Sequence, residues 1–130
     1  MVVPWRPCPD NLRSQTLYFT SMLEAASLFS AGRHAPGKIL VINRVNPLPF
    51  MLGFAPPRGG DLFWEPTAPP RPTPEMLADA DYVLVPTKFS SSPAMAKAAY
   101  ERFAPYLAAH FTRREETEYW ILYARMAPPP

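Results

Sequence analysis

The chain has 130 residues, of which 48% are hydrophobic and 18% are charged, a balance typical of a globular protein rather than a disordered one. Thirteen Lys and Arg residues against eleven Asp and Glu residues leave a formal net charge of +2 at pH 7. The basic residues are scattered, and the one adjacent pair, Arg113-Arg114, is followed directly by Glu115-Glu116. Nucleic acid is therefore not an expected partner.

The single cysteine, Cys8, excludes an internal disulfide and a metal site built from cysteines. The sequence contains no run of about 18 apolar residues, so it predicts no membrane-spanning helix. Its first residues also lack the apolar stretch of a signal peptide. These features favour the cytoplasm if the chain is complete, and the periplasmic or extracytoplasmic side if it is the tail of a membrane protein.

Proline accounts for 19 of the 130 residues and separates irregular from regular parts of the chain. Closely spaced prolines predict an extended arm over residues 1–13. Residues 47–74 combine proline with large aromatic residues and predict a long irregular insertion, of the kind that is often functional. Residues 127–130 form a proline tail. Residues 14–126 are therefore expected to fold as a single domain.

Two longer helices are predicted from apolar residues at spacings of three and four. The first spans residues 14–31, begins at Ser14 and stops at Gly32. Its predicted apolar face consists of Tyr18, Met22, Ala25, Ala26 and Phe29, with Leu23 beside them. The second begins at Pro93, and we expect a kink or break near Ala104, because Pro105 lacks a backbone donor and clashes with the preceding turn.

Short apolar runs predict the strands. Residues 38–43 and 82–85 are apolar on both faces, which is typical of parallel strands covered on both sides. A short helix from Pro74 to Asp79 should precede the second of these strands. Near the C-terminus, a strand at Phe111-Thr112, a turn at residues 113–116 and a strand over residues 118–125 predict an antiparallel hairpin.

These elements together predict an α/β fold. We expect a small mixed sheet in which two parallel central strands are joined by a C-terminal antiparallel hairpin, with helices flanking the sheet and a long proline-rich loop leaving it.

Polar residues follow both parallel strands, at the sheet edge where open α/β folds bind ligands. The candidate ligand-binding residues at this edge are Asn43, Arg44, Asn46, Arg58, Asp61 and Lys88. The alternative is that the asparagines cap turns and that the charged residues are solvated at the rim.

No catalytic residue is predicted. His34 and His110 stand alone in the sequence, and Cys8 has no base near it. Phosphate-binding and nucleophile-elbow motifs are absent, and no metal-ligand spacing occurs, so neither a cofactor nor a metal is expected. Residues 66–71 match P-x-x-P-x-R, a ligand form for SH3-type grooves, but a chain this rich in proline produces such a match easily.

Four segments carry a resemblance to a known family: KILVINRVNPLPF, ADADYVLVP, YERFAPYLAAHF and EYWILYAR, within residues 38–125. They resemble the soluble portion that follows the membrane helices in bacterial integral-membrane glycosyltransferases of the lipid-linked-sugar type. The resemblance implies an envelope-facing domain close to a membrane protein. The chain lacks the membrane helices and the acidic catalytic loop of these enzymes, so transferase activity does not carry over.

Two functions follow as expectations. The first is a non-catalytic accessory or binding domain of a larger, membrane-associated bacterial envelope system, with a membrane protein as partner or parent. The second is a small nucleotide- or sugar-binding protein, or a small enzyme, that uses the carboxyl edge of the parallel strands. Convergence in one enclosed pocket of five of the candidates would favour the second function, and their dispersal into solvent would count against it: Asn43, Asn46, Arg58, Asp61 and Lys88.

Overall fold

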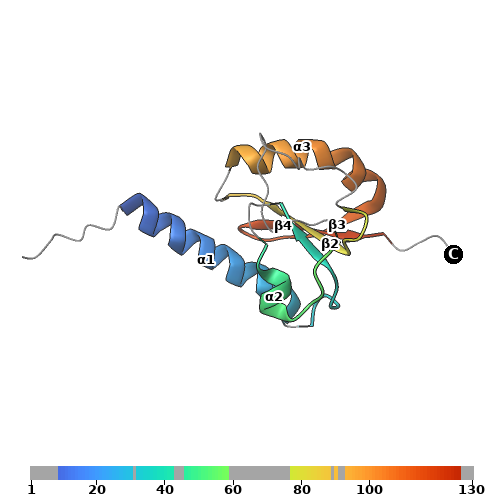
Figure 1. The fold of residues 1–130 in the computed structure, drawn as a ribbon, viewed down its shortest axis with the longest axis horizontal. Helices are drawn as coiled ribbons and strands as arrows, with labels where there is room; N and C mark the ends of the chain where they lie inside the picture. The colour runs from blue at the N-terminus through green and yellow to red at the C-terminus, as the bar shows by residue number, and fades with distance from the viewer. Residues whose placement is uncertain are drawn as a thin grey trace, which may run out of the picture.

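The computed structural model describes residues 9–30, 32–42, 46–58, 77–88, 90 and 93–126. In these residues a four-stranded sheet lies between two helical layers, with α1 and α2 on one face and α3 on the other (Figure 1). The elements are α1 (Pro9–Ser30), β1 (Ile39–Val41), α2 (Leu48–Leu52), β2 (Tyr82–Pro86), α3 (Pro93–His110), β3 (Phe111–Glu116) and β4 (Trp120–Arg125).

The sheet is mixed, with strand order β1-β2-β4-β3. β1 pairs with β2 in parallel, and β4 pairs with both β2 and β3 in antiparallel orientation. This confirms the predicted parallel pair and C-terminal hairpin. The prediction that both parallel strands are central holds for β2, whereas β1 lies at an edge and β4 takes the second inner position.

Alternate residues of the inner strands enter two separate cores, as the period of two in a strand requires. On the α1 face, Leu84 and Leu122 pack with fully buried residues of α1 such as Leu28. Trp120 is also fully buried there, and its Nε1 donates a hydrogen bond of 2.7 Å to the backbone carbonyl of Ser21 in α1. This bond fixes the position of α1 along β4.

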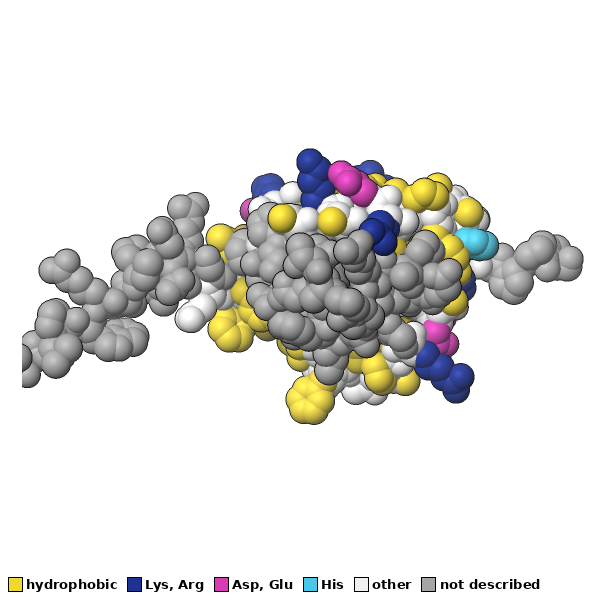
Figure 2. Space-filling view, turned by 45° about the horizontal axis from the view of Figure 1, so that its top comes forward, with side chains coloured by type: hydrophobic (Ala, Val, Ile, Leu, Met, Phe, Trp, Pro, Cys, Tyr) yellow, Lys and Arg dark blue, Asp and Glu magenta, His cyan; other side chains and the backbone are white. Residues whose placement is uncertain are grey.

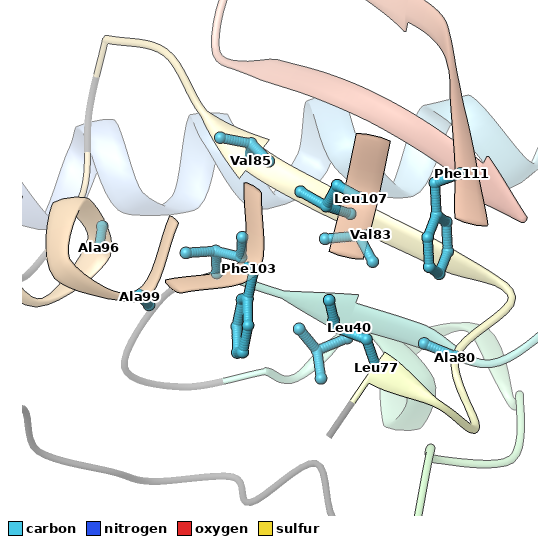
Figure 3. Packing of buried hydrophobic residues seen from close by; sticks show 11 residues of the cluster. Leu40, Leu77, Ala80, Val83, Val85, Ala96, Ala99, Phe103, Leu107 and Phe111 are labelled. Atoms are coloured by element: carbon cyan, nitrogen blue, oxygen red, sulfur yellow. The ribbon is translucent and has the colours of Figure 1, made fainter. Parts of the chain in front are cut away.

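The second core lies beneath α3. Ala99, Phe103 and Leu107 of α3 pack against Val83 of β2 and Leu40 of β1 (Figure 3). These α3 residues recur at a spacing of four, as expected for one buried face of a helix. A single helix therefore covers this side of the sheet in the described residues.

α1 begins earlier than predicted. It starts at Pro9, so the expected extended arm over residues 1–13 is wrong for residues 9–13. Proline is well tolerated in the first turn of a helix, where its missing N–H has no intrahelical partner. The predicted end is confirmed, because Gly32 adopts a left-handed φ of 73°. Leu23, expected beside the apolar face, is 65% exposed, whereas Leu28, which the prediction did not include, is fully buried.

The irregular insertion predicted for residues 47–74 contains a short helix, α2, which corrects that prediction over Leu48–Leu52. Pro47 and Pro49 occupy its first turn, where missing donors cost little. Gly53, with φ 72°, ends the helix by donating its N–H to the carbonyl of Pro49. Residues 59–76 lie outside the described residues. They include the P-x-x-P-x-R segment and the first half of the short helix expected over Pro74 to Asp79.

The break that was one alternative near Ala104 does not occur, because α3 continues through Pro105, whereas the bend of α3 toward its C-terminal end in Figure 1 agrees with the predicted kink. One further boundary differs from prediction. Residues 113–116, predicted as a turn, belong to β3, with a register irregularity between Arg113 and Glu115. The turn follows instead, where Thr117 donates its N–H to the carbonyl of Trp120.

Candidate functional site

The structure describes three of the six predicted site residues: Asn46, Arg58 and Lys88. Asn43, Arg44 and Asp61 lie outside the described residues. The three described residues do not meet. Asn46 and Arg58 contact segments at the amino ends of the parallel strands, whereas Lys88 follows the carboxyl end of β2.

Asn46 has a structural role. It is 9% exposed, its Nδ2 donates to the carbonyl of Ile39 at 2.7 Å, and its Oδ1 accepts the N–H of Leu48 at 3.3 Å. The side chain thus joins the start of β1 to the first turn of α2 and satisfies both of its own polar atoms. This agrees with the interpretation of Asn46 as a turn-capping residue.

Arg58 belongs to an ionic cluster at the amino end of the sheet. Its backbone N–H donates to Asp79 at 2.7 Å, and Lys38 Nζ lies 2.9 Å from the same carboxylate. The lysine hydrogen bond, followed by the Arg58 N–H, lowers the pKa of Asp79 below its usual value. Asp81 accepts the backbone N–H of Lys38 at 2.8 Å. The carboxylates of this end are therefore already engaged by neighbouring segments.

Gly37 and Arg125 complete the packing at the amino end. A Cβ at Gly37 would lie 2.9 Å from the ring of Tyr82, so only glycine lets the chain pass so closely there. The Arg125 guanidinium donates to the carbonyls of Leu77, Ala78 and Ala80, and so satisfies the turn before β2.

The carboxyl end of β2 borders a pocket of about 510 Å³ on the α3 side of the sheet. It is lined by Val85, Pro86, Thr87, Lys88, Ser90, Ala96, Lys97, Tyr100 and Ile121. Figure 3 shows Val85 and Ala96 toward one end of the α3 core, with Phe111 and Ala80 toward the other. The pocket thus lies at the Val85 end of that core, beside the N-terminal half of α3.

The pocket has an apolar floor and a basic rim. Val85 and Ala96 are buried, and Ile121, which pairs with Val85 in the sheet, is half-buried. Lys88 and Lys97 are both exposed at its edge. A volume in this range suits a small organic ligand.

Tyr100 supplies an aromatic wall that is 38% exposed. Burial, followed by hydrogen bonding with Tyr100, raises the pKa of Tyr123 on β4 above its ordinary value. Thr87, by contrast, donates its hydroxyl proton to the carbonyl of Glu118 at 2.7 Å and serves the adjoining turn.

His34 does not stand alone, which corrects the sequence-based view of it. Its Nε2 lies 2.9 Å from Glu115 of β3, and the same carboxylate lies 3.1 Å from Arg33. The His34 ring also lies against Phe29 and Tyr82. The two partners are separated by 81 positions, so no sequence signal could have paired them. This cluster ties the loop after α1 to the sheet.

In the described part of the chain, no group of three or more His, Cys, Asp or Glu side chains is arranged to hold a metal ion. Of the helices in the same residues, none combines the length and hydropathy that crossing a bilayer requires. Figure 2, with the α3 side turned forward, shows the visible Lys and Arg side chains standing apart on this face.

No protein-family model, curated protein or solved structure matches this chain.

Proposed function

We propose that this chain is a non-catalytic binding domain that holds a small ligand, a nucleotide or a sugar, in the pocket between β2 and α3. One observation carries the proposal: a pocket of about 510 Å³ at the carboxyl end of β2 combines an apolar floor, an aromatic wall and two lysines. In open α/β sheets this end of the parallel strands is the usual position for a ligand.

Binding is favoured over catalysis by the chemistry of the wall. Its described lining residues include no His, Asp, Glu or Cys, which are the usual proton donors and acceptors in catalysis. Lysine, serine, threonine and tyrosine at the rim are suited to hydrogen bonding with hydroxyl and phosphate groups. The apolar floor suits the flat face of a base or a sugar ring.

Titration of the protein with a panel of nucleotides and sugars, followed by amide NMR spectra, tests this proposal. We expect shifts to concentrate on the amides of Thr87, Lys97, Tyr100 and Ile121. Tyr100→Ala should weaken binding roughly tenfold, since it removes the aromatic wall. Tyr18, which packs on the opposite α1 face, offers a matched control as Tyr18→Phe. Saturable binding with shifts elsewhere, or no binding, would overturn the proposal.

A second candidate is the accessory domain of a membrane-associated envelope system, acting through contact with a membrane protein. It is favoured by large apolar side chains exposed on the α1–α2 layer: Phe19 (64%), Leu23 (65%), Phe50 (93%) and Met51 (46%). Exposed apolar side chains gathered on one layer are typical of interaction surfaces. The resemblance to the soluble portion of membrane glycosyltransferases supports the same class of partner.

Fractionation of cells in which the chain is expressed with its natural membrane proteins tests the second candidate. The parent protein should sediment with the membranes, and Phe50→Ser combined with Leu23→Ser should release it to the supernatant. Lys88→Gln, on the other side of the sheet, is the control. Equal distribution of the parent and the double variant would count against this function.

A further inference from the structure

The two lysines of the pocket differ in how far their charge is neutralised. Lys88 Nζ lies 3.5 Å from Glu118, and the two side chains are 65% and 58% exposed, so this ion pair is long and solvated. Lys97 has no carboxylate partner at ion-pair distance among the residues that the structure describes. Lys97 is therefore the more available cation of the pocket.

The position of Lys97 places this charge next to the aromatic wall. Lys97 and Tyr100 are three residues apart on α3, a spacing that makes side chains neighbours on one helix face. Both line the pocket, and Ile121 of β4 lies across from them. One surface thus offers a cation beside an aromatic ring, above an apolar floor.

The charged side chains in the described lining of the pocket are all positive. Its described residues include two lysines and no carboxylate. A ligand that fits this wall carries a flat or apolar part and a negatively charged part, and a neutral sugar would leave the lysines without a partner. Lysine is a common binder of phosphate groups, which it contacts as a point charge.

We propose that the ligand of this pocket carries a phosphate group, which Lys97 binds while its base or sugar ring packs against Tyr100 and Ile121. This inference rests on the proposed function, because it assigns the ligand class of the same pocket. Lys88 adds a second, partly neutralised charge at the rim. The basic residues are scattered along the sequence, which favours a small phosphorylated molecule over a nucleic-acid chain.

Calorimetric and NMR titrations with matched ligand pairs test this assignment. The probes are uridine 5′-monophosphate against uridine, glucose 1-phosphate against glucose, and inorganic phosphate alone. At least one phosphorylated member should bind roughly tenfold more tightly than its neutral partner, as expected for a charge-assisted contact. Raising the salt concentration should weaken the phosphorylated member selectively.

Lys97→Gln should bring the affinities of the two members of that pair close together and leave the affinity for the neutral one unchanged. Arg58→Gln is the matched control, since it also removes one positive charge but lies at the other end of the sheet. Both side chains are exposed, so each variant should keep the parent fold, which amide spectra would verify.

The outcomes separate the two proposals. If neutral and phosphorylated members bind the pocket equally and Lys97→Gln changes nothing, the phosphate assignment is overturned and the binding function stands. If no member shifts the pocket amides, both fail. Selectivity that Arg58→Gln abolishes as strongly as Lys97→Gln would also overturn the assignment to Lys97.

Discussion

The two ends of the parallel strand pair differ in how their polar groups are satisfied. At the amino end, Lys38, Asp79 and Arg125 each bond to another segment of the chain. At the carboxyl end, Lys88 has a long, solvated ion pair with Glu118, and Lys97 borders a pocket without a carboxylate partner among the described residues. Both ends are rich in polar residues, so polarity alone does not identify a site. The difference lies in whether the chain supplies the partners itself.

The two ends differ because more chain segments meet at the amino end. The loop before β1, the segment after α2, the turn before β2 and the end of β4 all meet at the amino end. Each of these segments supplies backbone or side-chain groups that hydrogen-bond to another of them. At the carboxyl end, the described lining comes from β2 and the segment after it, from α3 and from β4. Among the described residues, fewer segments supply polar partners at this end, and a pocket lies there.

The largest expected effect comes from Trp120, which fills the α1 face of the sheet beside Pro86 at the carboxyl end. Trp120→Ala should lower the free energy of unfolding by about 3–5 kcal/mol, the usual range for removing a buried aromatic side chain. Trp120→Phe keeps most of the ring, so its loss should be clearly smaller. Urea unfolding measures both. Equal losses would show that the bond to Ser21, and not packing, dominates.

At the amino end, Asn46→Ala should lower the free energy of unfolding by about 1–3 kcal/mol, because it leaves buried polar groups without partners. Asn46→Asp keeps an acceptor for the N–H of Leu48 but loses the donor to Ile39 and buries a charge. It should be at least as destabilising at neutral pH. Urea midpoints test the pair, and a neutral effect of Asn46→Ala would mean that this end is not held by the side chain.

The interactions of Asp79 should make the thermal stability of the protein depend on pH in the acidic range. Because the folded state lowers the pKa of Asp79, its contribution is complete above the usual value of 3.8 and is lost as the pH falls through the folded pKa. The asparagine side chain of Asp79→Asn does not titrate. Below about pH 4, near the usual aspartate pKa, the thermal midpoint of this variant should therefore fall less steeply than that of the parent protein. If the thermal midpoints of the two proteins fell equally steeply with decreasing pH, the interactions of Asp79 with Lys38 and Arg58 would not contribute to stability.

The smallest expected effect on stability lies at the pocket. Lys88→Gln and Lys97→Gln, alone or combined, should change the free energy of unfolding by no more than about 0.5 kcal/mol, as is usual for exposed residues. Urea unfolding of the double variant tests this. A loss as large as that of Asn46→Ala would mean that the lysines hold the fold together and would remove the contrast between the two ends.

Local sequence patterns predicted the fold class, but they predicted the boundaries of the helices and strands less well. Apolar runs predicted β1 and β2, and helical spacing predicted α1 and α3. The pattern failed where proline could be read in two ways. Pro9 starts α1 and Pro49 lies in the first turn of α2, although both were taken as signs of irregular structure. Whether a proline starts or breaks a helix depends on its position, since the first turn tolerates a missing N–H.

The candidate site was predicted only in part. Lys88 follows the carboxyl end of β2, as expected for a residue directly after a predicted strand. Arg58 went to the opposite end, because its loop returns to bond Asp79, 21 residues away. Lys97, Tyr100 and Ile121 were not predicted as site residues. Only the packing of α3 and β4 against β2 brings them to the pocket.

The sequence by itself determined the elements whose signals are local: a period of two in the strands, a period near 3.6 in the helices, and glycine at the end of α1. The tertiary structure alone decided which polar groups are satisfied. Lys38 meets Asp79 across 41 positions, and His34 meets Glu115 across 81. Such pairs depend on the path of the whole chain, and so does the lysine-bordered pocket beside β2, whose lining comes from β2, α3 and β4.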